Sequence, residues 1–270
     1  MNAVPSTFFA RNEFLIRRLH SLSGLIPVGA YMTVHLLVNA SLLNGPGAFQ
    51  NYVNGIHSAG IALPVIEWAF IFLPLIFHAV VGVWIIQSGH SNASQYRYVS
   101  NRRYTLQRWS GVVALLFILF HVFHLHGWFH FEAWLKNVAE PLGMAQFRPY
   151  NAASTLAIAL SGYVYPVFYA VGVIACVFHL ANGIWTMGMT WGVWLTPKAQ
   201  HRASIVCTLF GVFLGLVGLS ALWAAKTTDV DEARRVEKES YEAGVRTGKI
   251  KADPHKRSEP ESTDGIAVAE

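Results

Sequence analysis

The sequence predicts an all-α, polytopic membrane protein with five transmembrane helices in a bundle. Of its 270 residues, 53% are hydrophobic and only 13% are charged, whereas the charged share of a soluble domain is near a quarter. Five apolar segments lie at roughly 22–43, 62–87, 109–131, 155–187 and 203–225. Each is long enough to cross a bilayer, which takes about 20 residues in a helix.

The same patterning divides the chain into three parts. Residues 1–21 are polar to amphipathic and end in the basic run RRLH, which predicts a cytoplasmic amphipathic N-terminus. Residues 22–225 form the five-helix membrane domain, in which 44–61 is rich in Gly and Asn and predicts a loop that could hold a short interfacial helix. Residues 226–270 are charged and low in aromatic side chains, a composition that predicts a disordered tail.

The charge distribution predicts the orientation in the membrane. Residues 1–225 hold 11 Lys/Arg and 4 Asp/Glu, and nine of the 11 basic residues fall on the N-terminal side of the predicted spans. Only Lys136 and Arg148 fall on the other side. The positive-inside rule therefore places the N-terminus in the cytoplasm and the C-terminus outside, in the cell (inner) membrane. The basic residues form no continuous stripe, so the expected partner is membrane lipid and no nucleic acid is expected.

Each of the first four predicted spans has one central histidine, at positions 35, 78, 121 and 179. An ionisable side chain at membrane depth is costly and therefore a candidate functional residue. With a rise of about 1.5 Å per residue, His35 and His121 fall in the outer half of the membrane. His78 and His179 fall in the inner half.

Two pairs of imidazoles at matched depth are what two bis-histidine haems require, because each neutral ring gives one nitrogen to the iron. The sequence has no CxxCH motif, so such b-type haems would be bound without covalent links. His35 with His121 and His78 with His179 are thus the candidate iron ligands. Two alternatives remain open at this point: four structural histidines that bond neighbouring helices, and a transporter with ionisable groups at the midplane. A transporter should show charged partners near these histidines, yet the only acidic residue in a predicted span is Glu67.

Three glycines follow helical spacing in the last span, at positions 211, 215 and 218. Small residues at this spacing allow close approach of a neighbouring helix. The pattern predicts that the fifth helix packs tightly on another span. Pro74, four residues before His78, predicts a kinked or loosened second helix.

At these residues the chain resembles a known family, the five-helix cytochrome b subunit of succinate dehydrogenases and fumarate reductases. This subunit is a single-chain di-haem membrane anchor that works with menaquinone. The resemblance rests on these stretches: FLIRRLHSLSGLIPVG at 14–29, HLLVN at 35–39, EWAFIFLPLIFHAVVGVW at 67–84, NASQYRYVSNRRYTLQRWSGV at 92–112, HVFH at 121–124 and YAVGVIACVFHLANGIWTMGMTWGVWLTPKAQ at 169–200. Each central histidine lies on a haem-ligand motif of the family. The chain departs from the family in its tail after residue 225 and in a longer, histidine-rich connection between the third and fourth spans.

The resemblance implies a function. His78 and His179 would hold the inner, proximal haem, and His35 and His121 the outer, distal haem. Electrons would pass from an iron–sulfur subunit, through both haems, to menaquinone or another quinone. An FAD flavoprotein subunit would oxidise succinate, so the enzymatic reaction itself lies in partner subunits. The alternatives are a quinol-oxidising fumarate reductase anchor and the di-haem anchor of another respiratory dehydrogenase, such as a hydrogenase or formate dehydrogenase.

Several further residues are candidates for the two ends of this path. Glu67, acidic and at the outer end of the second span, is the candidate group for proton exchange with the quinone, and its alternative role is an interfacial carboxylate bonded to a loop. The candidate contacts to the propionates of the proximal haem, by charge and depth, are Arg17, His20, Ser21 and Arg108. The arginines could instead set topology and contact lipid headgroups. Weaker quinone-site candidates, which we expect to be wet residues of the outer surface, are His57, His124, His126 and His130.

Overall fold

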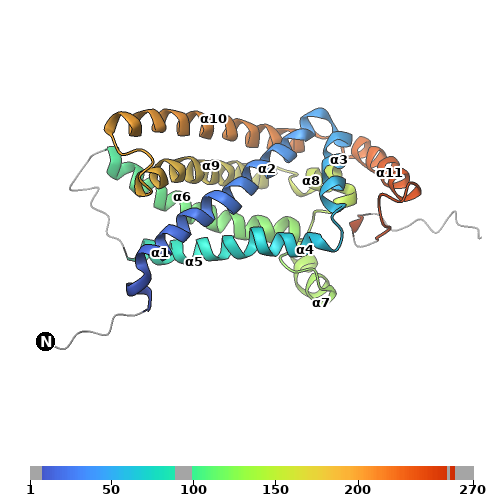
Figure 1. Ribbon diagram of the computed structural model, residues 1–270. Coiled ribbons are helices and arrows are strands. Elements are labelled where there is room, and N and C mark those ends of the chain that lie inside the picture. The colour runs from blue at the N-terminus through green and yellow to red at the C-terminus, as the bar shows by residue number, and fades with distance from the viewer. Residues whose placement is uncertain (1–7, 89–98, 254–255, 259–270) are drawn as a thin grey trace, which may run out of the picture. The chain divides into compact units, whose positions relative to one another are not determined.

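The structure is a computed structural model that describes residues 8–88, 99–253 and 256–258 (Figure 1). The secondary structure of these residues is helical, and none of them lies in a strand. Five helical stretches are long and apolar enough to cross a membrane, namely Arg11–Asn44, Ala62–Gln87, Asn101–His126, Val164–Thr190 and Pro197–Thr227. The predicted all-α class with five apolar spans is therefore confirmed.

Most of these stretches are built from more than one element. The first span contains α1 (Phe8–Ser23), η1 (Gly24–Gly29), α2 (Ala30–Ala40) and η2 (Ser41–Asn44). The second contains α4 (Ala62–Glu67), η3 (Trp68–Phe72) and α5 (Leu73–Gln87). The third contains α6 (Val99–His121) and η4 (Val122–His126). The last two are α9 (Val164–Thr190) and α10 (Pro197–Thr227). The remaining elements are α3 (Pro46–His57), α7 (Glu132–Trp134), η5 (Leu135–Ala139), η6 (Glu140–Leu142), η7 (Pro149–Asn151), α8 (Ala152–Ala159) and α11 (Val230–Arg246).

Two wider, π-helical turns interrupt the first two spans, and each is associated with a proline. Pro27 lies inside η1, and Pro74 is the second residue after η3. Proline has no N–H to donate to the preceding turn, and its ring clashes with the carbonyl four residues earlier. The helix therefore widens at these points, which confirms the loosening predicted at Pro74.

Two predicted span boundaries were wrong. The third span begins near residue 101 and ends at His126, earlier than the predicted range. The apolar segment predicted as 155–187 is divided into α8 and α9 by a turn at Gly162, whose φ is +71°. Glycine adopts this left-handed conformation without the steric cost that a Cβ would bring. The composition stays apolar across the turn, so hydropathy alone does not reveal it.

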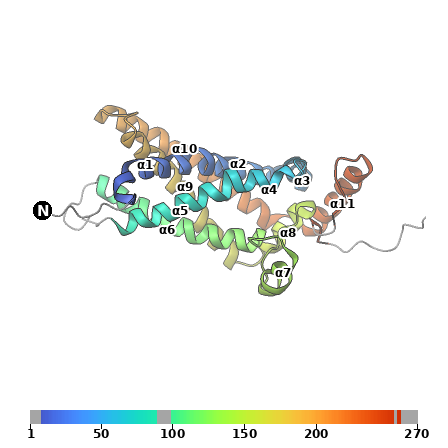
Figure 2. The ribbon, with the colours of Figure 1, turned by 60° about the horizontal axis from the view of Figure 1, so that its bottom comes forward.

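The chain divides into two compact units, each made of three segments. The first unit consists of Met1–Leu37, Ile61–Ile118 and Tyr169–Leu219. The second unit consists of Val38–Gly60, Leu119–Phe168 and Ser220–Glu270. In the first unit, α1 packs beside α5, and the π-helical turn η1 packs beside η3 (Figures 1 and 2).

Within the first unit, α10 packs on α9 through the predicted glycines. A Cβ added at Gly211 would lie 2.9 Å from the Cβ of Ala181, and one at Gly218 would lie 2.6 Å from Cγ1 of Val173. Residue numbers rise along α10 while they fall along α9, so the two helices are antiparallel neighbours. The prediction of tight packing at these glycines is confirmed.

In the second unit, α3, α8 and α11 pack together around the N-terminus of α8. Glu237 of α11 is fully buried and accepts hydrogen bonds from the backbone N–H groups of Ala153 (2.7 Å) and Ser154 (2.9 Å). Gln50 of α3 accepts from the N–H of Ala152 at 3.1 Å. The first N–H groups of a helix have no partner within it, so side chains of α3 and α11 satisfy those of α8.

The structure corrects the prediction of a disordered tail for residues 230–246. These residues form α11. Its N-cap is Asp229, whose carboxylate accepts hydrogen bonds from the N–H groups of Asp231 (2.9 Å) and Glu232 (3.1 Å). Such an N-cap and acidic first turn stabilise a helix. Ala233, Glu237 and Tyr241 are buried at a spacing of four residues, so one face of a polar helix is covered. Average composition does not detect this periodicity. Residues 259–270 lie outside the described residues.

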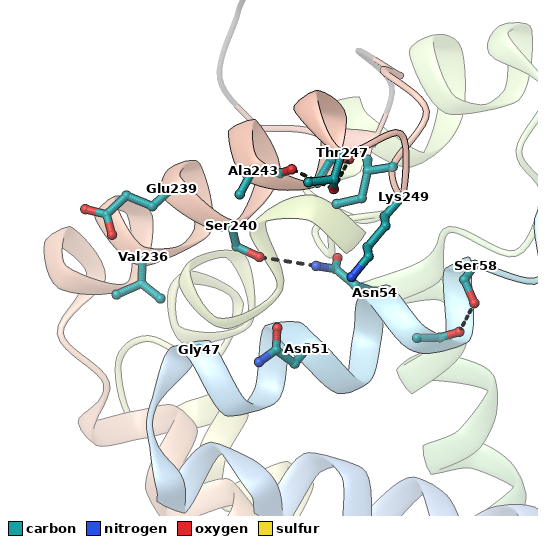
Figure 3. A pocket seen from close by; sticks show the side chains of 13 residues that line it. Gly47, Asn51, Asn54, Ser58, Val236, Glu239, Ser240, Ala243, Thr247 and Lys249 are labelled. Carbon is teal, nitrogen blue, oxygen red and sulfur yellow. Dashed lines mark hydrogen bonds between the residues drawn. The ribbon is translucent and has the colours of Figure 1, made fainter.

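A cleft of ≈ 880 Å³ lies between α3 and α11 in the second unit (Figure 3). Asn54 donates a hydrogen bond to Ser240 across it at 3.3 Å, and Asn51, Glu239 and Lys249 also line it. Apolar side chains line it as well, among them Val236, Ala243 and Ile250. The cleft contains none of the site residues predicted from the sequence.

The glycine packing predicts different outcomes for two similar substitutions in α10. Gly218→Ala should destabilise the folded protein by about 1–3 kcal/mol relative to Gly215→Ala, because overfilling a packed contact costs energy of this size. A Cβ at Gly215 would meet its nearest atom, Cγ1 of Val177, at an ordinary 3.9 Å. Both substitutions change helix propensity equally, so thermal unfolding in detergent isolates the packing effect. Equal unfolding midpoints would contradict the packing described for α9 and α10.

The role of Glu237 predicts that Glu237→Ala releases α11 from the second unit. The substitution leaves buried N–H groups of α8 without acceptors, which costs about 1–3 kcal/mol each. Limited proteolysis with trypsin should then cleave at Arg234 and Arg235 faster than in the unsubstituted protein. Glu239→Ala is the matched control, because Glu239 lies on the same helix and is exposed. Cleavage of both variants at the same rate would contradict the role of Glu237.

Candidate functional site

The structure brings together the two histidines of the predicted inner pair. His78 lies on α5 and His179 on α9, both in the first unit. Their ring centroids are 6.1 Å apart, and the ring planes are nearly perpendicular at 83°. Two helices far apart in the sequence thus present imidazoles to each other, whereas their depth in the membrane stays a prediction.

A backbone carbonyl fixes the tautomer of each ring. Nδ1 of His78 lies 2.9 Å from the carbonyl oxygen of His20, and Nδ1 of His179 lies 3.1 Å from that of Gln107. A carbonyl oxygen can only accept, so Nδ1 of His78 carries the hydrogen and donates it. Nδ1 of His179 also lies 3.3 Å from Nε2 of Gln107 and 3.3 Å from Oγ of Ser110, and its shorter contact, to the carbonyl, favours the same tautomer. In both rings Nε2 is then the nitrogen with a lone pair. Metal-ligating histidines have this arrangement, in which the other nitrogen donates to a carbonyl or carboxylate.

Each ring also lies against a glycine of a neighbouring element. A Cβ added at Gly24 in η1 would overlap the ring of His78, and one at Gly111 in α6 would lie 2.8 Å from Cε1 of His179. A larger residue at either position would push the ring aside. The glycines therefore allow the close approach of backbone to ring that this geometry requires.

A third histidine completes the cluster. The ring of His20 stacks on that of His78, with centroids 4.0 Å apart and planes at 9°. Among the described residues, Nδ1 of His20 is buried and has no hydrogen-bond partner. Buried polar atoms almost always have one. The unsatisfied nitrogen of a ring stacked on His78 fits a site that accommodates an additional polar group, such as a haem propionate.

Two of the other predicted propionate contacts, Arg17 and Arg108, lie near the C-terminal end of α5. Arg17 contacts the hydroxyl of Ser88 at 3.4 Å, and Arg108 donates to the carbonyl of Ile85 at 3.3 Å. Ile85 is seven residues beyond His78, which is about 10 Å along a helix. Ser21 instead accepts a hydrogen bond from Nε1 of Trp191 at 3.0 Å. The two arginines thus meet the same end of α5, whereas Ser21 contacts the segment after α9.

A polar network behind His179 was not predicted from the sequence. Asn182 donates to the side-chain oxygen of Gln107 at 2.7 Å, and Nε of Arg103 donates to Oδ1 of Asn182 at 2.9 Å. These residues lie near the ends of predicted spans, where polar residues are expected. The spacing of these residues in the sequence was the signal that could have revealed the network. Asn182 follows His179 by three residues and Gln107 follows Arg103 by four, so each pair shares a helix face.

The two histidines of the predicted outer pair belong to different compact units. His35 lies on α2 in the first unit, where its ring stacks with that of Tyr31 at 5.5 Å. His121 is the last residue of α6 and belongs to the second unit. Glu67 is the last residue of α4, is half-buried and immediately precedes η3. The pairing of His35 with His121 and the role of Glu67 stay predictions.

The remaining histidines differ in exposure, and one of them corrects an expectation. His124 is fully buried and stacks on Tyr165 at 4.5 Å, so it is not a wet surface residue. His130 is exposed and its ring lies 4.1 Å from that of His126. His57 is half-buried, and burial lowers its pKa below the ordinary value. Within the described part of the chain, no three His, Cys, Asp or Glu side chains are grouped so that they could hold a metal ion by themselves.

Comparison with known proteins supplies the family. No protein-family model matches the sequence. The chain is similar to the succinate dehydrogenase cytochrome b558 subunit of Bacillus subtilis (strain 168), with 37% identity over 212 residues. The matched region covers 78% of this chain and 96% of the relative. Identity at this level over nearly the whole relative shows common family membership: the chain belongs to the succinate dehydrogenase cytochrome b subunits.

Proposed function

We propose that this chain, the cytochrome b membrane subunit of a succinate dehydrogenase, binds two b-type haems, the inner one through His78 and His179 and the outer one through His35 and His121. The observation that carries the proposal is the inner pair, in which both Nδ1 atoms donate to carbonyls and both Nε2 atoms keep a lone pair. Bound haem supplies one-electron transfer between an iron–sulfur subunit and a quinone. The similarity to a succinate dehydrogenase subunit favours this function over a transporter, over another respiratory dehydrogenase and over a fumarate reductase anchor.

The protein residues at the inner site have distinct roles in this proposal. His78 and His179 offer Nε2 to the iron, and the carbonyls of His20 and Gln107 keep the rings in the correct tautomer. The side chains of Arg17, His20, Ser21 and Arg108 bind or neutralise the propionates. Support comes from the buried nitrogen of His20 and from the placement of both arginines at one end of α5.

The membrane orientation follows from the charge distribution. Nine of the 11 basic residues before residue 226 lie on the side of the N-terminus, which supports a cytoplasmic N-terminus and an outer C-terminus in the cell membrane. The inner haem site then faces the cytoplasm. The iron–sulfur subunit docks on that face and carries the FAD flavoprotein subunit in which succinate is oxidised.

Glu67 is the proposed proton-exchanging group of a quinone site at the outer end of the second span. A quinone takes up protons as it is reduced, so a side chain that can exchange protons must lie near its ring oxygens. Glu67 is half-buried and adjoins the π-helical turn η3, and such turns are frequent at functional sites. The resemblance of the chain to five-helix di-haem anchors favours menaquinone as the quinone.

Substitution of one ligand from each pair should remove a different haem. His78→Ala should remove the inner haem and His35→Ala the outer one, since each haem would lose one of the two histidine side chains proposed to hold it. A pyridine haemochrome assay should give half the haem of the unsubstituted protein in each case, and the reduced-minus-oxidised spectra of the two variants should differ. Loss of the same spectral component from both variants would contradict the pairing.

Substitution of Glu67 should separate quinone reduction from succinate oxidation. Glu67→Gln should lower succinate:quinone reductase activity by about 10²–10⁴-fold, the usual contribution of a positioned acid or base. Succinate oxidation with a soluble dye as acceptor and the haem spectrum should not change, because neither uses this carboxylate. Unchanged quinone reductase activity would mean that Glu67 is only an interfacial carboxylate.

A further inference from the structure

One residue of α6 holds both the ring and the backbone of His179. The carbonyl of Gln107 accepts the hydrogen bond from Nδ1 of His179 at 3.1 Å. The side-chain amide of Gln107 donates back to the carbonyl of His179 at 3.1 Å. The position of Gln107 therefore determines where the ring of His179 lies and how it is rotated.

Gln107 is in turn held by a buried amide of α9. Its Oε1 accepts a hydrogen bond from Nδ2 of Asn182 at 2.7 Å. Asn182 is only 3% exposed, and its Oδ1 accepts from Nε of Arg103 at 2.9 Å. An amide whose oxygen and nitrogen are both engaged in a buried network can adopt only one orientation. Asn182 thus transmits the position of Arg103 to Gln107.

Arg103 is fixed at the junction of three helices. It lies on α6, and its Nη1 donates a hydrogen bond to the hydroxyl of Ser204 on α10 at 2.8 Å. Its guanidinium lies 3.8 Å from the ring centroid of Trp185 on α9. A guanidinium is planar and presents several donors in a rigid fork, whereas a lysine has a single nitrogen on a flexible stem. A lysine here would keep the charge but could not reproduce both hydrogen bonds and the stacking together.

We propose that Arg103 is a positioning residue for the inner haem site: through Asn182 and Gln107 it sets the ring orientation of His179. The inference rests on the proposed ligation of the inner haem by His78 and His179. Partners behind a ligating histidine fix its tautomer and ring orientation, and through them the electronic properties of the metal. Arg103 therefore affects the haem without contact with it.

The test uses the assembled enzyme and the low-spin ferric haem signals in electron paramagnetic resonance. His179→Ala identifies the inner signal by its loss. Arg103→Lys should then shift the g values of the inner signal and its midpoint potential, while the outer signal and the haem content stay unchanged. Ser204→Ala, which removes one of the two acceptors of Arg103, should give a smaller shift of the same signal. Arg102→Lys is the matched control, because Arg102 is the exposed neighbour of Arg103, and should leave both signals unchanged.

A double variant tests whether the residues act as one chain. Arg103→Lys combined with Asn182→Ser should shift the inner signal no further than Asn182→Ser alone, because residues that act through each other are not additive. Unchanged g values in Arg103→Lys, with a shifted potential only in Arg103→Gln, would show that Arg103 acts by charge alone and would overturn the inference. Retention of both signals in His179→Ala would instead overturn the proposed ligation.

Discussion

The inner site depends on one interaction made twice, the hydrogen bond from Nδ1 of a histidine to a backbone carbonyl of another helix. His78 donates to the carbonyl of His20 and His179 to that of Gln107. An imidazole within a membrane span is costly unless its polar atoms are satisfied. Each bond satisfies one nitrogen within the protein and leaves Nε2 for the iron of the proposed haem. The neighbouring helices thus keep these two histidines neutral and oriented.

This interaction constrains the surrounding helices. A ring can reach a carbonyl of another helix only where the backbones approach closely, and Gly24 and Gly111 provide that approach. Gly24 begins the π-helical turn η1, which contains Pro27 and packs against η3. On the far side of His179, Arg103 and Asn182 hold the helix that supplies the second carbonyl. Glycines, π-helical turns and the polar network therefore serve the same pair of rings.

Much of this arrangement could be predicted from the sequence. The features that could not be predicted were missed for identifiable physical reasons. The spans follow from hydropathy, and the inner pair follows from depth because helical rise is nearly constant. The turn at Gly162 was missed because apolar composition continues through it, and α11 was missed because average composition conceals the buried face around Glu237. The partners of Arg103 depend on which helices are neighbours, and hydropathy carries no such information. The outer pair was predicted by the same depth estimate as the inner pair, but its two histidines belong to different units.

The central claim is that this subunit of succinate dehydrogenase holds two haems between histidine side chains. The most direct test is the ratio of haem b to polypeptide in the purified, unsubstituted protein, together with its ferric electron paramagnetic resonance spectrum. We predict two haems per chain, both low-spin and each held by two histidine nitrogens. A single haem, a high-spin signal at full occupancy or no haem would contradict it.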